Sequence, residues 1–130
     1  MIIRGSAGAN NDRGAAAVEF ALVLPILILL VGGIVDFGFA LNTQVSLTHA
    51  AREGVRIEAL DSGDPVAAAL AAFAAPAASD VDAEVTRACP HDDGARVVVR
   101  ANSQVFFVGL LPFVDNQLPL EGQAVMRCGG

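Results

Sequence analysis

The sequence predicts an α+β protein, in which a long N-terminal helix precedes a small antiparallel β-sheet. Three observations lead to this fold class. The stretch from Phe20 to Val35 has no charged side chain, residues 47–57 repeat with helical spacing, and residues 81–86 alternate with the period of a strand. The chain therefore divides into a leader at 1–14, a transmembrane and then amphipathic helix at 15–60, and a small α+β domain at 61–130.

The first part of the predicted helix is long enough to cross a membrane. Within the 21 residues from Ala15 to Val35, Glu19 carries the one charge, and a helix needs roughly 20 residues to span the hydrocarbon core. Arg4 and Arg13 precede the segment, and positive residues are retained on the cytoplasmic side. We therefore expect a single-pass protein of the cytoplasmic (inner) membrane, with its N-terminus in the cytoplasm and its C-terminal domain outside.

Two further structural expectations concern the leader and the proline within the apolar segment. Residues 1–14 are rich in Gly and Asn and show no apolar periodicity, so we expect them to be disordered. Pro25 lies inside the apolar segment. Because proline removes one backbone hydrogen bond and presses on the preceding turn, it predicts a bend between Ala21 and Pro25.

Beyond Asp36 the pattern becomes amphipathic without a turn signal, so the helix is expected to continue to about residue 60. One face carries mostly small residues: Leu47, Ala50, Ala51 and Gly54. The other face is polar: His49, Arg52, Glu53 and Arg56. The turn formers of residues 61–65 then end the helix.

The last half of the chain contains the signals of one short helix and three strands. An Ala-rich helix is expected at 66–75, ended by Pro76. Strands are expected from Asp80, over 96–107 and over 120–128, with a tight connection at 90–94 that joins the first two as a hairpin. These strands predict a small antiparallel sheet.

Cys89 and Cys128 are the two cysteines of the chain. In an oxidising compartment outside the membrane we expect them to form a disulfide. Closing a loop of about 40 residues would stabilise a domain by about 4 kcal/mol in the chain-entropy model. The alternative is two buried free thiols. The two cysteines and two scattered histidines show no metal-ligand spacing.

Composition and motif content argue against several classes of function. The net charge is −6 and lysine is absent, whereas nucleic acid is held by clustered basic residues. His49, Arg52 and Glu53 are better explained as a solvated helix face, and His91, Asp92 and Asp93 as a turn. No nucleophile is paired with a base, and no Gly-rich loop follows a strand. We therefore expect a protein that is not an enzyme, with no metal, cofactor, nucleic acid or small-molecule substrate.

Glu19 is the most informative residue of the membrane segment. Charged residues within a membrane helix cost about 2.5–3.5 kcal/mol on insertion scales, so a carboxylate there needs a partner. If a protease cut after Gly14, the new amino terminus of Ala15 would lie four residues from Glu19. The carboxylate would then neutralise the ammonium group of a neighbouring subunit. The other interpretation is a glutamate near the membrane interface, where a charge at a helix end is tolerated.

Three features in this order resemble the TadE-like family. They are Gly14 followed by Glu19 and Phe20, the apolar run at 20–38, and the sequence HAAREGVR at 49–56. TadE-like proteins are pseudopilins, relatives of type IV pilins that belong to tight-adherence (Tad) pilus systems. The resemblance covers roughly 14–56, about a third of the chain.

The resemblance implies a pilin-like fold and a role in pilus assembly and cell adhesion. It implies cleavage by a prepilin peptidase between Gly14 and Ala15, with other pilins or pseudopilins of a Tad (type IVb) pilus as partners. Glu19 would be the assembly carboxylate beside Phe20, and Pro25 the helix-bending proline. The motif beyond the membrane would consist of Ala50, Ala51, Arg52, Gly54 and Arg56.

Two other functions remain open. One is a bitopic membrane anchor that presents a small extracytoplasmic binding domain. The other is a secreted protein, because residues 38–40 loosely resemble a signal-peptidase site. The mature N-terminus distinguishes the three: a chain that begins at Ala15 supports the pseudopilin, an intact chain the anchor, and release after Ala40 the secreted protein.

Overall fold

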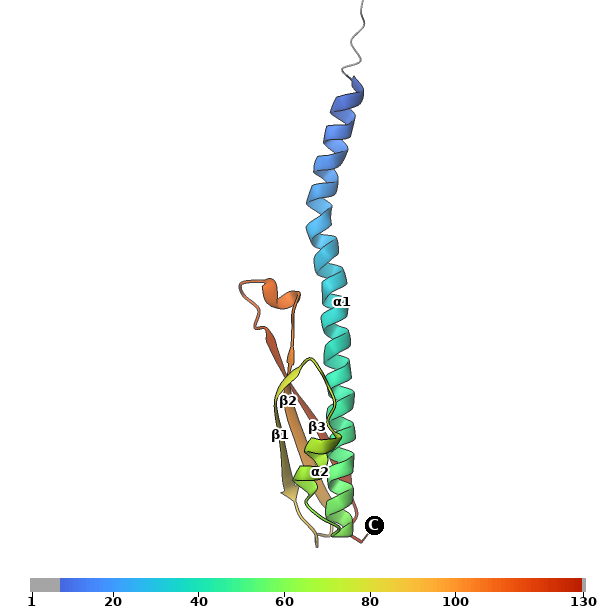
Figure 1. The fold of residues 1–130 in the computed structure, drawn as a ribbon, viewed down its shortest axis with the longest axis vertical. Helices are drawn as coiled ribbons and strands as arrows, with labels where there is room; N and C mark the ends of the chain where they lie inside the picture. The colour runs from blue at the N-terminus through green and yellow to red at the C-terminus, as the bar shows by residue number, and fades with distance from the viewer. Residues whose placement is uncertain (1–7, 130) are drawn as a thin grey trace, which may run out of the picture.

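The computed structural model describes residues 8–129 and confirms the predicted fold class (Figure 1). A long N-terminal helix, α1 (Gly8–Leu60), is followed by a short helix, α2 (Pro65–Ala72). The remaining elements are the strands and a short 3-10 turn: β1 (Ala78–Arg87), β2 (Ala95–Gln104), η1 (Val108–Leu110) and β3 (Gln117–Met126).

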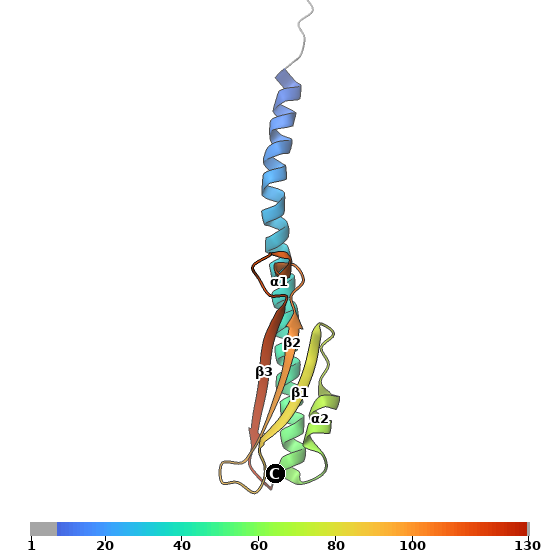
Figure 2. The ribbon, with the colours of Figure 1, turned by 90° about the vertical axis from the view of Figure 1, so that its left-hand side faces the viewer.

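Helix α1 has two halves with different surroundings. It contains 53 residues and is therefore about 80 Å long. The first half projects away from the rest of the chain, whereas the second half lies along the sheet (Figures 1 and 2). Every residue from 12 to 31 is exposed, and burial begins at Gly32. This helix is long and apolar enough to cross a membrane, which fits a single-pass membrane protein.

The start of α1 differs from the expectation. Residues 8–14 are helical, whereas the leader was expected to be disordered; residues 1–7 lie outside the described part of the chain. No proline separates residues 8–14 from the apolar segment, and extending an existing helix is much easier than starting one. Pro25 lies inside α1 without ending it.

Helix α2 begins and ends through side-chain hydrogen bonds. The Asp64 carboxylate accepts the N–H groups of Val66 (2.9 Å) and Ala67 (3.2 Å), and Pro65 occupies the first turn. The helix ends at Ala72, three residues earlier than expected. The hydroxyl of Ser46 in α1 accepts the N–H of Ala74 at 2.8 Å, which holds the segment after α2 outside the helix.

The three strands form one antiparallel sheet in the order β1-β2-β3. Strand β2 is central, and its inward side chains Val97 and Val99 are fully buried against α1. Together with Leu47 and Val55 of α1 they make up the larger side chains of the core. Strand β2 ends at Gln104, before the two phenylalanines that were expected to continue it.

Glycines bring α1 close to its neighbours. A Cβ atom on Gly54 would lie 2.9 Å from the Cβ of Ala69 in α2 and 2.9 Å from the carbonyl oxygen of Pro65. A Cβ on Gly122 of β3 would lie 2.7 Å from the carbonyl oxygen of Leu47. Both distances are shorter than real Cβ contacts, so the helix–helix and helix–strand spacing at these points requires glycine.

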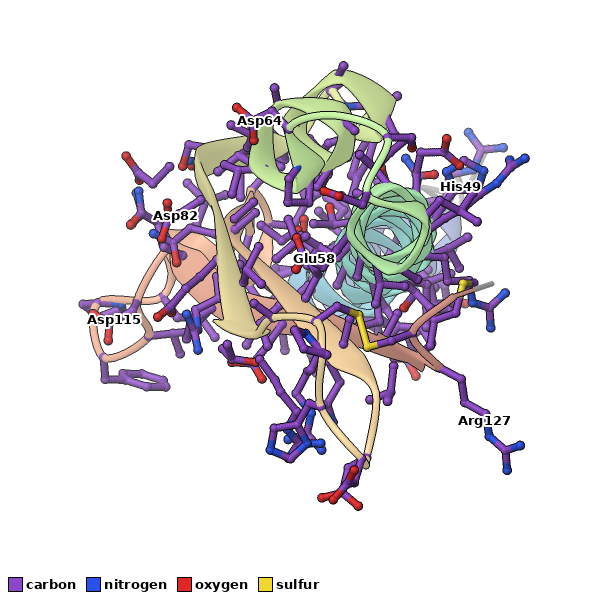
Figure 3. All side chains as sticks on the ribbon, turned by 90° about the horizontal axis from the view of Figure 1, so that it is seen from below. His49, Glu58, Asp64, Asp82, Asp115 and Arg127 are labelled. Atoms are coloured by element: carbon purple, nitrogen blue, oxygen red, sulfur yellow. A yellow bond between two sulfur atoms is a disulfide. The ribbon has the colours of Figure 1, made fainter. Side chains whose placement is uncertain are left out.

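The predicted disulfide is present. It joins the segment that follows β1 to the segment that follows β3, near the end of α1. Cys89 and Cys128 are bonded, with their Cα atoms 5.7 Å apart. The Glu58 side chain accepts the N–H of Cys89 at 3.0 Å, and the N–H of Gly129 donates to the carbonyl of Ala59 at 2.9 Å. Figure 3 shows the bond beside the end of α1, with Glu58 pointing between the helix and the sheet.

We expect Gly54→Ala to destabilise the packing of the sheet and α2 on α1 by about 1–3 kcal/mol, because the new methyl group meets the Pro65 carbonyl and the core is already filled. The matched control is Gly38→Ala on the same helix, where a Cβ meets nothing within 4 Å. This control should be neutral or stabilising by up to about 1 kcal/mol, since alanine favours helix. Urea unfolding of the full chain in detergent, followed by far-UV circular dichroism, measures both. Equal effects of the two substitutions would contradict the close packing at Gly54.

Candidate functional site

The residues predicted for processing and assembly lie on the exposed first half of α1. Gly14, Ala15, Glu19 and Phe20 are all helical, and their side chains are exposed. Apart from the neighbouring backbone of α1, no heavy atom of the described residues lies within 4 Å of the position that a Cβ would take on Gly14. None of the ion pairs formed in the described part of the chain involves Glu19. The fold thus leaves this whole segment open to molecules outside the chain.

The motif beyond the membrane has both a core side and a surface side. Ala50 and Ala51 are fully buried, and Gly54 is buried with them. Arg52 and Arg56 are exposed on the opposite face. His49 points away from the sheet, as Figure 3 shows from below. The predicted amphipathic pattern is confirmed, and the small residues of the motif are those on which the sheet and α2 pack.

Asp36 makes the contact that sequence reasoning missed. Its side chain is buried, although it follows the apolar segment directly. One carboxylate oxygen accepts the N–H of Phe106 at 2.9 Å. The other accepts the N–H groups of Phe107 at 2.9 Å and of Val108 at 2.8 Å. Three successive backbone donors that no strand or helix pairs are therefore satisfied by one side chain of α1.

These donors belong to the β2–β3 loop, which we define as residues 105–116. The loop is closed at its base by the N–H of Val105, which donates to the carbonyl of Asn116 at 2.9 Å. Its first residues pack on α1 on either side of Asp36. The Phe107 ring occupies the space that a side chain on Gly32 would need, and the ring of Phe106 meets that of Phe39 edge-on, with centroids 6.0 Å apart.

The sequence held a signal for this contact. Gly32 and Asp36 are four residues apart and so share one face of the helix. Gly32 has no side chain, so another segment can approach α1 closely there. The Asp36 carboxylate on the same face can then accept hydrogen bonds from that segment. The β propensity of Phe106 and Phe107 predicts that the strand continues through them. Instead the Asp36 carboxylate accepts their N–H groups, and the two residues lie outside the sheet. The charge of Asp36 by itself indicates only the end of the apolar segment.

The outward face of the sheet carries a separate polar cluster. Arg100 of β2 donates to Glu121 of β3 at 2.9 Å and lies 3.3 Å from Glu84 of β1. The hydrogen bond to Glu121, followed by that to Glu84, raises the pKa of Arg100 above its ordinary value. The three groups are exposed, so the cluster orders the surface more than it stabilises the fold. Within residues 8–129, no group of three or more His, Cys, Asp or Glu side chains could hold a metal ion.

The geometry is therefore that of an exposed apolar helix whose second half carries a packed domain. Residues 14–56 match the TadE-like protein family. The match begins at Gly14, ends at Arg56 and covers about a third of the chain, all of it within α1. It confirms the resemblance found in the sequence. Neither the curated proteins nor the solved structures gave a match. Together with the membrane-length helix, the TadE-like segment indicates a membrane protein related to Tad pili.

We expect Asp36→Ala to release the β2–β3 loop while the sheet stays folded. Each hydrogen bond to a charged group contributes about 1.5–3 kcal/mol, so the amides of residues 106–108 should exchange with solvent at least about tenfold faster. Asp115→Ala is the matched control, because Asp115 is an exposed carboxylate of the same loop (Figure 3). Hydrogen exchange of the full chain in detergent, read by mass spectrometry, measures both. Unchanged exchange in Asp36→Ala would show that the carboxylate does not hold the loop.

Proposed function

We propose that this protein is a non-catalytic, membrane-anchored pseudopilin that takes part in assembly of a Tad-type (type IVb) pilus after processing by a prepilin peptidase. The observation that carries the proposal is the TadE-like match over residues 14–56, which starts at the proposed cleavage position. In support, residues 12–31 of α1 are exposed along their whole length, although most of them are apolar. Such a surface needs lipid or neighbouring helices around it.

The proposed orientation places the N-terminus in the cytoplasm and the sheet domain outside. Arg13 precedes the apolar segment, and basic residues next to a membrane helix favour the cytoplasmic side. The bond between Cys89 and Cys128 lies at the far end of the domain, and disulfides persist in oxidising compartments outside the cytoplasm. Both observations support the same orientation.

The proposed processing site is the peptide bond between Gly14 and Ala15. A proteolytic site has to leave the helix before it can enter an extended active-site cleft. Glycine within a helix is about 1 kcal/mol less favourable than alanine, so α1 is weakened at Gly14. Among the residues that the structure describes, no segment outside the neighbouring turns of α1 packs on this glycine. Gly14 thus combines easy access with easy local unwinding.

The proposed assembly step pairs Glu19 with the new amino terminus of another subunit. In lipid an unpaired carboxylate is costly, and an ammonium group on an adjacent helix removes that cost. No ion pair within the described residues occupies Glu19, so its carboxylate is available to a neighbour. Phe20 lies beside it and is exposed, where it can contact the same helix. Pro25 leaves one backbone carbonyl of α1 without its usual donor, which allows the helix to adjust its path among its neighbours.

Replacement of Gly14 by leucine should block processing, because a bulky side chain at the cleavage position excludes the substrate from the peptidase and strengthens the helix. Gly38→Leu is the control, since Gly38 is also an exposed glycine of α1. N-terminal sequencing of membrane-extracted protein measures the outcome. The unsubstituted chain and the control should begin at Ala15. An uncut unsubstituted chain would instead favour the bitopic anchor, and a start after Ala40 the secreted protein.

Removal of the Glu19 carboxylate should weaken assembly without affecting insertion or cleavage. In Glu19→Ala we expect a mature chain that begins at Ala15 and remains in the membrane, but much less of it in sheared pili, because the counter-charge of its neighbour is left unpaired. Glu53→Ala is the control, a carboxylate of the same helix outside the apolar segment. Quantitative immunoblots of membrane and pilus fractions compare the two. Unchanged pili with Glu19→Ala would reject the pairing.

A further inference from the structure

The tip of the β2–β3 loop is an exposed apolar surface. Residues 105–114 contain no charged or hydrogen-bonding side chain, yet Leu110 is 78% exposed and Phe113 is 81% exposed. Phe106, at the start of the loop, is 55% exposed. In Figures 1 and 2 the loop lies at the end of the sheet that faces the free half of α1. An apolar tip of this kind on a small domain marks a surface that contacts something else.

The position of the loop along α1 indicates what this apolar surface contacts. The loop contacts α1 at Gly32, Asp36 and Phe39. A span of about 20 residues ends at Ile34 when it is counted from Ala15, and at Phe39 when it is counted from Phe20, the first residue after Glu19. With either count the loop lies at the boundary between hydrocarbon and headgroups, on the side of the membrane that faces the sheet domain.

The hydrogen bonds at Asp36 allow both the carboxylate and the β2–β3 loop to lie at the membrane boundary. A free carboxylate at the membrane boundary and three unpaired backbone N–H groups would each be costly away from water. In the fold they satisfy one another, because both carboxylate oxygens accept N–H groups of Phe106, Phe107 and Val108. The apolar side chains of the loop are thereby presented without exposing polar backbone at its attachment to the helix.

We propose that the β2–β3 loop inserts into the leaflet on the domain side and forms a second lipid-contacting element beside the transmembrane helix. The occupant is lipid because the loop continues a surface that lipid already covers: Ile34 and Phe37 of α1, next to the loop, are each 64% exposed. Leu110 and Phe113 extend that apolar surface sideways from the helix. The proposal rests on the membrane span of α1 and does not depend on a role in a pilus.

Tryptophan is absent from the chain, so a single introduced tryptophan reports its own surroundings. The test variant is Phe113→Trp in the full chain, reconstituted into phosphatidylcholine vesicles in which a fraction of the lipid carries bromine on its acyl chains. Val23→Trp reports the span itself, because Val23 is an exposed residue in the middle of the apolar segment. Leu60→Trp is the matched control: Leu60 is an exposed apolar residue, and it lies about 36 Å beyond Asp36 along α1.

We expect blue-shifted emission and quenching by brominated lipid for Val23→Trp and Phe113→Trp, and neither for Leu60→Trp. Leu110→Trp should repeat the result of Phe113→Trp, which guards against a local effect of one substitution. Emission from Phe113→Trp that resembles Leu60→Trp, while Val23→Trp is quenched, would overturn the proposal and leave the span intact. Blue-shifted emission that brominated lipid does not quench would also overturn it, because protein would then cover the loop. An unquenched Val23→Trp would remove the span and this inference together.

Discussion

One continuous helix has to satisfy two environments, and the rest of the fold follows from that constraint. Residues 12–31 of α1 are exposed and largely apolar, whereas Ala50 and Ala51 are completely buried against the domain. No turn separates the two regions. The change from one environment to the other is therefore made by side-chain size: large aliphatic residues where the helix faces lipid, and small ones where a sheet has to pack on it. Because Gly54 and Gly122 lack side chains, the domain lies close enough to α1 to form a core from only a few larger residues.

Asp36 marks the point at which the two environments meet. A charge at that position ends the uncharged run in the sequence, and in the fold it also attaches the β2–β3 loop to the helix. Its two effects have one physical origin. A carboxylate next to hydrocarbon needs several donors, and an irregular loop has backbone N–H groups to offer. The loop can therefore remain irregular and apolar at a place where unpaired backbone would otherwise be unfavourable.

The sequence predicted those features that depend on neighbouring residues. The helical repeat that includes Leu47 and Ala51, and the alternation around Ala83, are local patterns and they identified α1 and the sheet correctly. The disulfide was predicted from the two cysteines of a domain that is expected to lie outside the cytoplasm, and Cys89 and Cys128 are bonded. The contact of Asp36 with Phe106 joins residues 70 positions apart. The spacing of Gly32 and Asp36 indicates where a segment can approach α1, but no local pattern identifies residues 106–108 as that segment. For the same reason, β propensity predicts too long a strand β2, and Ala content predicts too long a helix α2. In each case an α1 side chain accepts an N–H group just beyond the element: Asp36 accepts that of Phe107, and Ser46 that of Ala74.

The two attachments of the domain to α1 have a mechanical consequence. The sheet packs along the second half of the helix, and the β2–β3 loop holds the same helix about two to four turns before the core begins at Leu47. A domain fixed at both heights cannot swing or rotate about α1 without breaking one of the two contacts. Any adjustment of the domain relative to neighbouring subunits has to come from the unattached part of the helix, where Pro25 weakens the backbone hydrogen bonding. On the proposed function, a rigid outer half and a pliable membrane half would let Glu19 find its partner without disturbing the packing of the domain.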